Sequence, residues 1–164
     1  MKNITKTFLS LISVLLIISS LSACSNGNYT DTKSAQDISA AIEPCITTDG
    51  GTKMLDSDAI LEISDTELSY LKDFVMIRAN NTKNINEYGI FRVENGKAED
   101  MKKLLSTYVE NKQKTYRAMD YFPEETEKID CATVEVFGNY VVYSFLNEND
   151  TEAFHNAVKD QISK

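Results

Sequence analysis

The sequence predicts an α+β domain in which two hairpins form an antiparallel four-stranded sheet. A long central helix and N- and C-terminal helices are expected on one face of that sheet. Three observations predict this fold. Two pairs of β-rich segments are each joined by a turn signal, a long segment between the pairs has helical periodicity, and amphipathic segments stand at both ends. The 164 residues suit a single domain of this kind.

The domain is expected to begin with a short helix at Ala35–Ile42, whose apolar residues share one face and which ends before Pro44. Residues 47–53 contain a Gly pair among polar side chains, which predicts a loop. Residues 54–63 carry apolar side chains among acids and predict a second short helix. Ser64–Glu67 has the spacing of a capping box, so a further helical turn is expected just after it.

The first hairpin is predicted from strands at residues 74–79 and 88–93, with a turn at Asn80–Asn84. The first of these strands is apolar on both faces, which is typical of a central strand. The second hairpin is predicted from strands at residues 133–137 and 140–146, which flank the turn dipeptide Gly138-Asn139.

Residues 97–119 give the strongest helical signal, because their apolar side chains recur at intervals of three and four. Leu104, Leu105 and Tyr108 form one stripe that we expect to pack on the sheet, while Lys103 lies on the opposite side. A final helix is predicted after a cap at residues 149–152, with its apolar residues on one side.

Charge and composition exclude several classes of protein. The chain has 25 acidic and 17 basic side chains, a formal net charge of −8, so it is a poor partner for nucleic acid, whose binding depends on neutralising phosphates. One His and 3 Cys are too few for a zinc or iron–sulfur site. We therefore expect no metal and no cofactor.

The first 25 residues are typical of a targeting signal. Two early lysines precede an apolar run that is shorter than the segment a membrane-spanning helix usually needs. The tetrapeptide Leu21, Ser22, Ala23 and Cys24 follows and resembles a bacterial lipobox, in which the Cys is acylated with a chain such as palmitate and the polypeptide is cut just before it. A plain secreted protein cut near Ala23, or an uncleaved anchor, is the alternative.

This interpretation divides the chain into three parts. Residues 1–23 are a lipoprotein signal peptide, residues 24–34 are a lipid-anchored flexible tether, and residues 35–164 are one domain. The expected partner of the anchor is membrane lipid, because the acyl chain on Cys24 would insert into the bilayer. The expected location is the outer face of the cell membrane.

The mature region resembles a family of small lipoproteins of unknown function, found mainly in Gram-positive bacteria. The resemblance covers about residues 36–162 and rests on LKDFVMIRA, on EYGIFRVENGKAEDMKKLLSTYVENKQKTY and on the hairpin around VFGNYVVYSF. It implies an envelope location. The family has no established activity, so the resemblance implies no catalytic residue.

The candidates for chemistry are few. His155 is the single His, and we interpret it as a surface His near an acid rather than as a catalytic residue. Cys45 and Cys131 could form a disulfide after export or remain two separate thiols. Clusters of acidic residues could supply the paired carboxylates of a glycosidase, but acidic residues at helix N-termini give the same pattern.

A binding face is the more suggestive candidate. Arg78 and Arg92 lie one on each strand of the first hairpin, where they could hold an anion or pair with Glu87 and Asp73 across the strands. Tyr140 and Tyr143 fall on opposite faces of one strand, so that a sheet covered on one side would leave one of them exposed. The set of possible binding residues is Tyr88, Tyr140, Tyr143, Arg78 and Arg92.

Together these observations predict a non-catalytic binding or interaction module of the cell envelope, tethered by lipid. Its partner would be an envelope protein or a glycan, with no nucleic acid. An envelope hydrolase and an accessory subunit of a membrane complex are the alternative classes.

Overall fold

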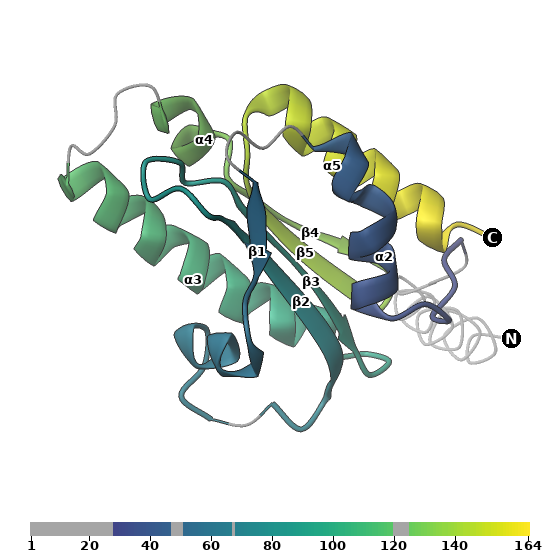
Figure 1. The fold of residues 1–164 in the computed structure, drawn as a ribbon. Helices are drawn as coiled ribbons and strands as arrows, with labels where there is room; N and C mark the ends of the chain where they lie inside the picture. Colours follow the sequence, from purple (N-terminus) through teal and green to yellow (C-terminus); the bar gives the residue numbers. More distant parts are fainter. Residues whose placement is uncertain (1–27, 47–50, 67, 120–124) are drawn as a thin grey trace, which may run out of the picture.

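The computed structural model describes residues 28–46, 51–66, 68–119 and 125–164, and it shows an α+β fold built on one antiparallel sheet (Figure 1). The strands lie in the order β1-β2-β3-β5-β4, and each neighbouring pair is antiparallel. They are β1 (Thr52–Met54), β2 (Leu71–Ala79), β3 (Glu87–Val93), β4 (Thr133–Phe137) and β5 (Tyr140–Phe145). The helices are α2 (Ala35–Ile42), α3 (Ala98–Met119), α4 (Thr126–Asp130) and α5 (Glu148–Ile162), with 3-10 turns at Glu43–Cys45 and Ser57–Glu62.

The sheet has five strands, one more than the sequence predicts. The additional strand is β1, which lies at the edge of the sheet and pairs with Ile77–Ala79 at the end of β2. The three residues Thr52, Lys53 and Met54 show no apolar alternation, so the segment has no strand signal of its own. The free edge of β2 supplies the hydrogen bonds that make it a strand.

Helices cover both faces of the sheet, so the expectation of helices on a single face is wrong. α3 lies along one face, while α2 and α5 pack together on the other (Figure 1). The physical reason is that the middle strands are apolar on both sides. All six residues of β5 are buried, and a strand buried on both faces needs a layer on each.

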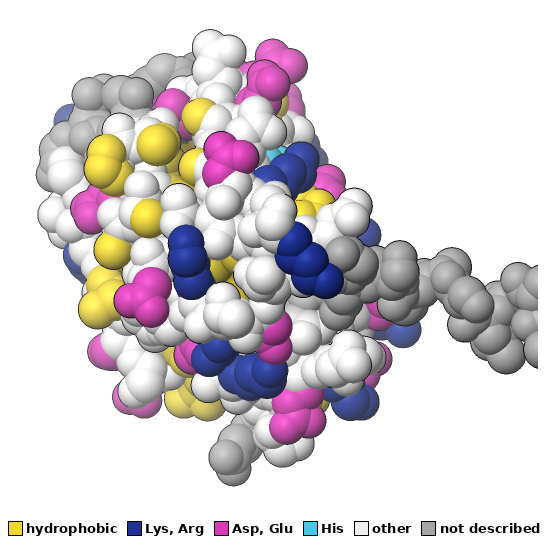
Figure 2. Space-filling view, turned by 90° about the vertical axis from the view of Figure 1, so that its right-hand side faces the viewer, with side chains coloured by type: hydrophobic (Ala, Val, Ile, Leu, Met, Phe, Trp, Pro, Cys, Tyr) yellow, Lys and Arg dark blue, Asp and Glu magenta, His cyan; other side chains and the backbone are white. Residues whose placement is uncertain are grey.

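The long helix packs as its periodicity predicts. Met101, Leu105, Tyr108 and Val109 of α3 are buried in the core on that face of the sheet. Leu104 is half-buried at the margin of this stripe, and Lys103 is exposed on the opposite side. On the face that carries α2 and α5, acidic, basic and uncharged polar side chains are mixed, and the apolar side chains lie mainly toward the left of the view (Figure 2).

The described part of the expected tether, residues 28–34, is attached to the domain. The backbone N–H of Thr30 donates to the carbonyl of Ile162 at 2.7 Å, and Tyr29 packs against the ring of Phe137. Asp31 forms an ion pair with Lys72 at 2.5 Å. The fold therefore begins earlier than residue 35, because the polar-looking segment carries an aromatic ring and an acid that both find partners.

Two predicted helix starts differ from the structure. The capping-box spacing of Ser64–Glu67 predicted a helical turn after it, but Leu71 opens β2, and the Ser64 hydroxyl instead accepts from the N–H of Thr66. α5 begins earlier than expected, because the side chain of Asn147 caps it by accepting from the N–H of Asp150 at 2.8 Å.

Candidate functional site

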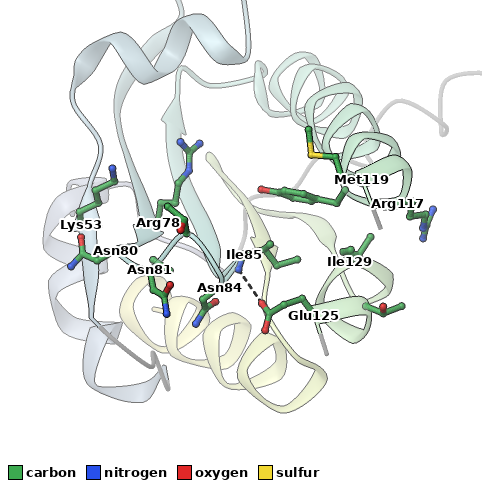
Figure 3. Close-up of a pocket in the computed structure, with 14 residues that line it drawn as sticks. Lys53, Arg78, Asn80, Asn81, Asn84, Ile85, Arg117, Met119, Glu125 and Ile129 are labelled. Atoms are coloured by element: carbon green, nitrogen blue, oxygen red, sulfur yellow. Dashed lines mark hydrogen bonds between the residues drawn. The ribbon is translucent and has the colours of Figure 1, made fainter. Parts of the chain in front are cut away.

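A cavity of about 480 Å³ lies at one end of the sheet (Figure 3). β1, the loop between β2 and β3, the C-terminal end of α3, and α4 enclose it. Its volume falls within the range of roughly 300–1,000 Å³ that is usual for sites of small molecules.

One wall of the cavity is polar and comes from the sheet. Lys53 of β1 and Arg78 of β2 stand on it beside Asn80 and Asn81 of the following loop (Figure 3). Lys53 is directly opposite Arg78 in the β1–β2 register, so both side chains project from the same face of the sheet. Arg78 pairs with Glu62 at 2.8 Å and also with Glu87.

The facing wall is apolar and comes from the helices. Tyr116 and Met119 of α3 and Ile129 of α4 form it, and Ile85 of the loop between β2 and β3 also lines the cavity. Burial, helped by the nearby charge of Glu87, raises the pKa of Tyr116 to about 12, so its ring is neutral at ordinary pH. Arg117 points away from the cavity (Figure 3) and pairs with Asp130 at 2.8 Å.

Glu125 joins the two walls. Its carboxylate accepts the backbone N–H of Ile85 at 2.9 Å, which ties the start of α4 to the loop between β2 and β3 (Figure 3). Lys128 donates to the same carboxylate at 2.8 Å and neutralises its charge. The buried acid therefore fixes the shape of the cavity.

A buried ionic centre lies next to the polar wall. Glu87 is 1% exposed, and its carboxylate accepts hydrogen bonds from Tyr108 at 2.6 Å, from Tyr143 at 2.8 Å and from Lys112 at 2.5 Å. Arg78 donates to it as well. One carboxylate thus connects α3, β2, β3 and β5, and it holds Arg78 where that side chain lines the cavity.

The charges at this centre are set by their surroundings. Burial alone would raise the pKa of Glu87, but the charges of Lys112 and Arg78 outweigh burial and hold that pKa below its ordinary value. Burial lowers the pKa of Lys112, with the charge of Glu87 opposing the change. Burial also raises the pKa of Tyr143 well above its ordinary value. Glu87 is accordingly ionised and the tyrosine is neutral, which suits a fixed scaffold.

The two arginine pairings expected from the register are confirmed. Arg78 lies opposite Glu87 and pairs with it, and Arg92 lies opposite Asp73 and pairs with it. Of the five residues expected to form a binding face, Arg78 is the one that lines the cavity.

The expectation of an exposed aromatic sheet face is wrong. Tyr88, Tyr140 and Tyr143 are all buried, because helices cover both faces of the sheet. The hydroxyl of Tyr140 donates to the carbonyl of Lys33 at 2.7 Å. These rings are core residues, and each of their hydroxyls has a polar partner within hydrogen-bond distance.

Cys45 and Cys131 are free thiols in the structure, so they do not form the disulfide that export would permit. His155 is half-buried between the rings of Phe137 and Phe154, and its Nε2 lies 3.3 Å from the Thr133 hydroxyl. Burial lowers the pKa of His155, with Glu135 opposing the change. None of these three side chains lines the cavity.

The signal peptide and the residues of the lipobox-like motif, Leu21, Ser22, Ala23 and Cys24, lie outside the described residues. Within the part that the structure describes, no helix is both long enough and apolar enough to cross a membrane. The same residues contain no group of three or more His, Cys, Asp or Glu placed to hold a metal ion.

Sequence reasoning missed most of the cavity. The sequence patterns predict a turn for Asn80 and Asn81, a loop for Lys53 and a helix end for Met119. The run Asn80–Asn84, in which three of five side chains are amides, is the one signal that could have marked it, because such a run exceeds what a tight turn requires.

A comparison with family models matches the chain to a family. The family described as Domain of unknown function (DUF4358) matches residues 45–146, which is more than half of the chain and includes the sheet and α3. No curated protein and no solved structure matches the chain.

Proposed function

Because the chain belongs to the DUF4358 family, whose function is unknown, we propose a function from the chain's own residues: a membrane-anchored extracytoplasmic lipoprotein whose domain is a binding module of the cell envelope, with the cavity beside α4 as its binding site. The cavity is the observation that carries this proposal. It combines an apolar wall with a few placed polar groups, which is the usual composition of a small-molecule site.

The rigidity of its surroundings supports a binding role. Arg78 is held by Glu62 and Glu87, and Glu125 fixes the loop that carries Ile85. Side chains that are already locked lose little conformational entropy when a ligand arrives, so more of the contact energy is retained as affinity.

The position of the cavity also suits a tethered protein. Lys72, near the start of β2, binds Asp31 of the N-terminal segment, whereas Arg78 and Ala79, at the end of β2, line the cavity. Ala79 lies seven positions after Lys72 in the strand, a distance of about 23 Å at the usual rise per residue. A chain anchored before residue 28 would thus carry its cavity on the end away from the anchor (Figure 1).

A charge placed in the apolar wall tests the binding site. Met119 is 57% exposed, so Met119→Glu is expected to change stability by no more than about 0.5 kcal/mol while it disrupts the wall. In a strain that lacks the gene, the Met119→Glu variant, present at the wild-type protein level, is expected to fail to complement the deletion.

Leu61→Glu is the matched control, because Leu61 is 59% exposed and does not line the cavity. It is expected to restore the phenotype fully. Equal restoration by both variants would contradict the assignment of the cavity as the binding site.

A further inference from the structure

We propose that the cavity binds a small organic carboxylate with a short apolar chain, placing the carboxylate against Lys53 and Arg78 and the chain against the helical wall. This inference rests on the proposed function, since it names the ligand class of the same site. Three features of the cavity carry it.

The first feature is a pair of like charges. Lys53 and Arg78 are directly opposite each other across the β1–β2 register and both line the cavity. Like charges in this position repel each other and destabilise a sheet, and an anion bound between them offsets the repulsion because it attracts both. Arg78 has carboxylates on its other side, but among the described residues no ion pair reaches Lys53. Of the three cations that line the cavity, Arg78 and Arg117 have ion-pair partners, and Lys53 is the one for which the described part of the chain provides none.

The second feature is the supply of further donors. The Arg78 guanidinium carries five N–H groups, and its bonds to Glu62 and Glu87 use at most three of them. The side-chain carbonyl of Asn81 accepts the N–H of Lys83 at 2.9 Å, which directs that carbonyl to its own loop and leaves the amide NH₂ as the group that can face a ligand. These groups match the acceptor oxygens of a carboxylate.

The third feature is the separation of polar and apolar walls. The sheet side carries the cations and amides, and the helix side carries Tyr116, Met119 and Ile129 (Figure 3). The one acid on the lining, Glu125, already accepts from Lys128 and from the backbone of Ile85, so its charge is neutralised. A ligand with an anionic end and an apolar end satisfies both walls at once.

Hexanoate and its neutral analogue hexanamide are the probes, and the full chain in lipid nanodiscs is the sample. The chain has 5 Met, so ¹³C-methyl labelling of methionine gives a short list of signals. Met119 lines the cavity, while Met76 and Met101 are buried in the core on the α3 face. Hexanoate is expected to shift the Met119 signal saturably and to leave the Met76 and Met101 signals in place.

Two comparisons test the role of charge. Hexanamide is expected to bind roughly tenfold more weakly than hexanoate, and Lys53→Gln is expected to weaken hexanoate binding by roughly tenfold, the equivalent of one charge-assisted hydrogen bond. Lys103→Gln, which removes an exposed cation from α3 outside the cavity, is the matched control and is expected to leave the affinity unchanged.

Three results would overturn the inference. If hexanoate and hexanamide shift Met119 with equal affinity, or if Lys53→Gln binds hexanoate as tightly as the wild type, the cavity binds ligands without recognising charge, and the proposed function still holds. If neither probe shifts Met119, this ligand class is wrong, and the comparison of Met119→Glu with Leu61→Glu decides separately whether the cavity is a site at all.

Discussion

Glu87 shows how one side chain can organise the surroundings of a site. It receives hydrogen bonds from two tyrosines, a lysine and an arginine, so that its desolvation is offset by four donors. The nitrogen of Lys112 also lies 5.0 Å from the centre of the Tyr108 ring, which adds a cation–π contact. The buried, ionised form of Glu87 is therefore stable only while all four donors are in place.

Removing the charge of Glu87 is expected to be costly. Glu87→Gln leaves Arg78 and Lys112 without their shared counter-charge, and breaking a buried pair in this way costs about 3–5 kcal/mol. Urea unfolding at neutral pH measures the loss. Glu110→Gln, an exposed acid on α3, is the control and is expected to change the unfolding free energy by less than about 0.5 kcal/mol. Equal effects of the two variants would contradict the account of the cluster.

The pH dependence of stability follows from the same residue. The pKa of Glu87 is lower in the folded protein than in the unfolded chain, so its contribution is complete above the ordinary glutamate pKa of about 4.3 and is lost as the pH falls through the lowered folded pKa. The stability difference between the wild type and Glu87→Gln is accordingly expected to shrink at acidic pH. A difference that stays constant down to pH 3 would show that the charge of Glu87 is not its cause.

At the scale of elements, α3 holds one face of the sheet. Leu105 is fully buried on α3, so Leu105→Ala is expected to destabilise the protein by about 2–5 kcal/mol, the usual cost of truncating a buried leucine. Lys103→Ala, two residues earlier on the exposed side, is expected to have almost no effect. Thermal melts of the two variants measure the difference, and a Leu105→Ala melt that matches the wild type would refute the packing.

Local signals predicted the elements that are long or strictly periodic. The stripe of α3 and the residue pairs Arg78–Glu87 and Arg92–Asp73 followed from spacing alone, because helix period and hairpin register are local properties. β1 was missed because a three-residue edge strand depends on its neighbour, β2.

The arrangement of layers could not be predicted in the same way. An amphipathic pattern shows that a helix has an apolar side but not which sheet face that side covers, so α3 was placed on the same face as α2 and α5. Because of this error, one of Tyr140 and Tyr143 was expected to be exposed, whereas the helices on the two faces bury both. The cavity was missed for a related reason, since residues far apart in sequence, such as Lys53 and Ile129, meet there only in the folded chain.

At the scale of the whole molecule, the first described residues and the C-terminus lie at one end of the sheet, and the cavity lies at the other. Tyr29 bridges to Ser163 beside the turn at Gly138, and the cavity opens beyond the other end of β2 and β3 (Figure 1). An anchor upstream of residue 28 would then leave the cavity accessible from the side that faces away from the membrane. The proposed anchor and the proposed site are in this sense independent, and each can be removed without the other.

Replacing Cys24 tests the anchor by itself. In the proposed lipoprotein the Cys24 thiol accepts the lipid, so Cys24→Ser is expected to abolish incorporation of a labelled fatty acid and to release the protein from the membrane fraction or stall its processing. Cys45→Ser is the matched control, because Cys45 is an exposed free thiol, and this variant is expected to incorporate label as the wild type does. Label that persists in Cys24→Ser, or that disappears in Cys45→Ser alone, would place the lipid elsewhere and refute the assignment of Cys24.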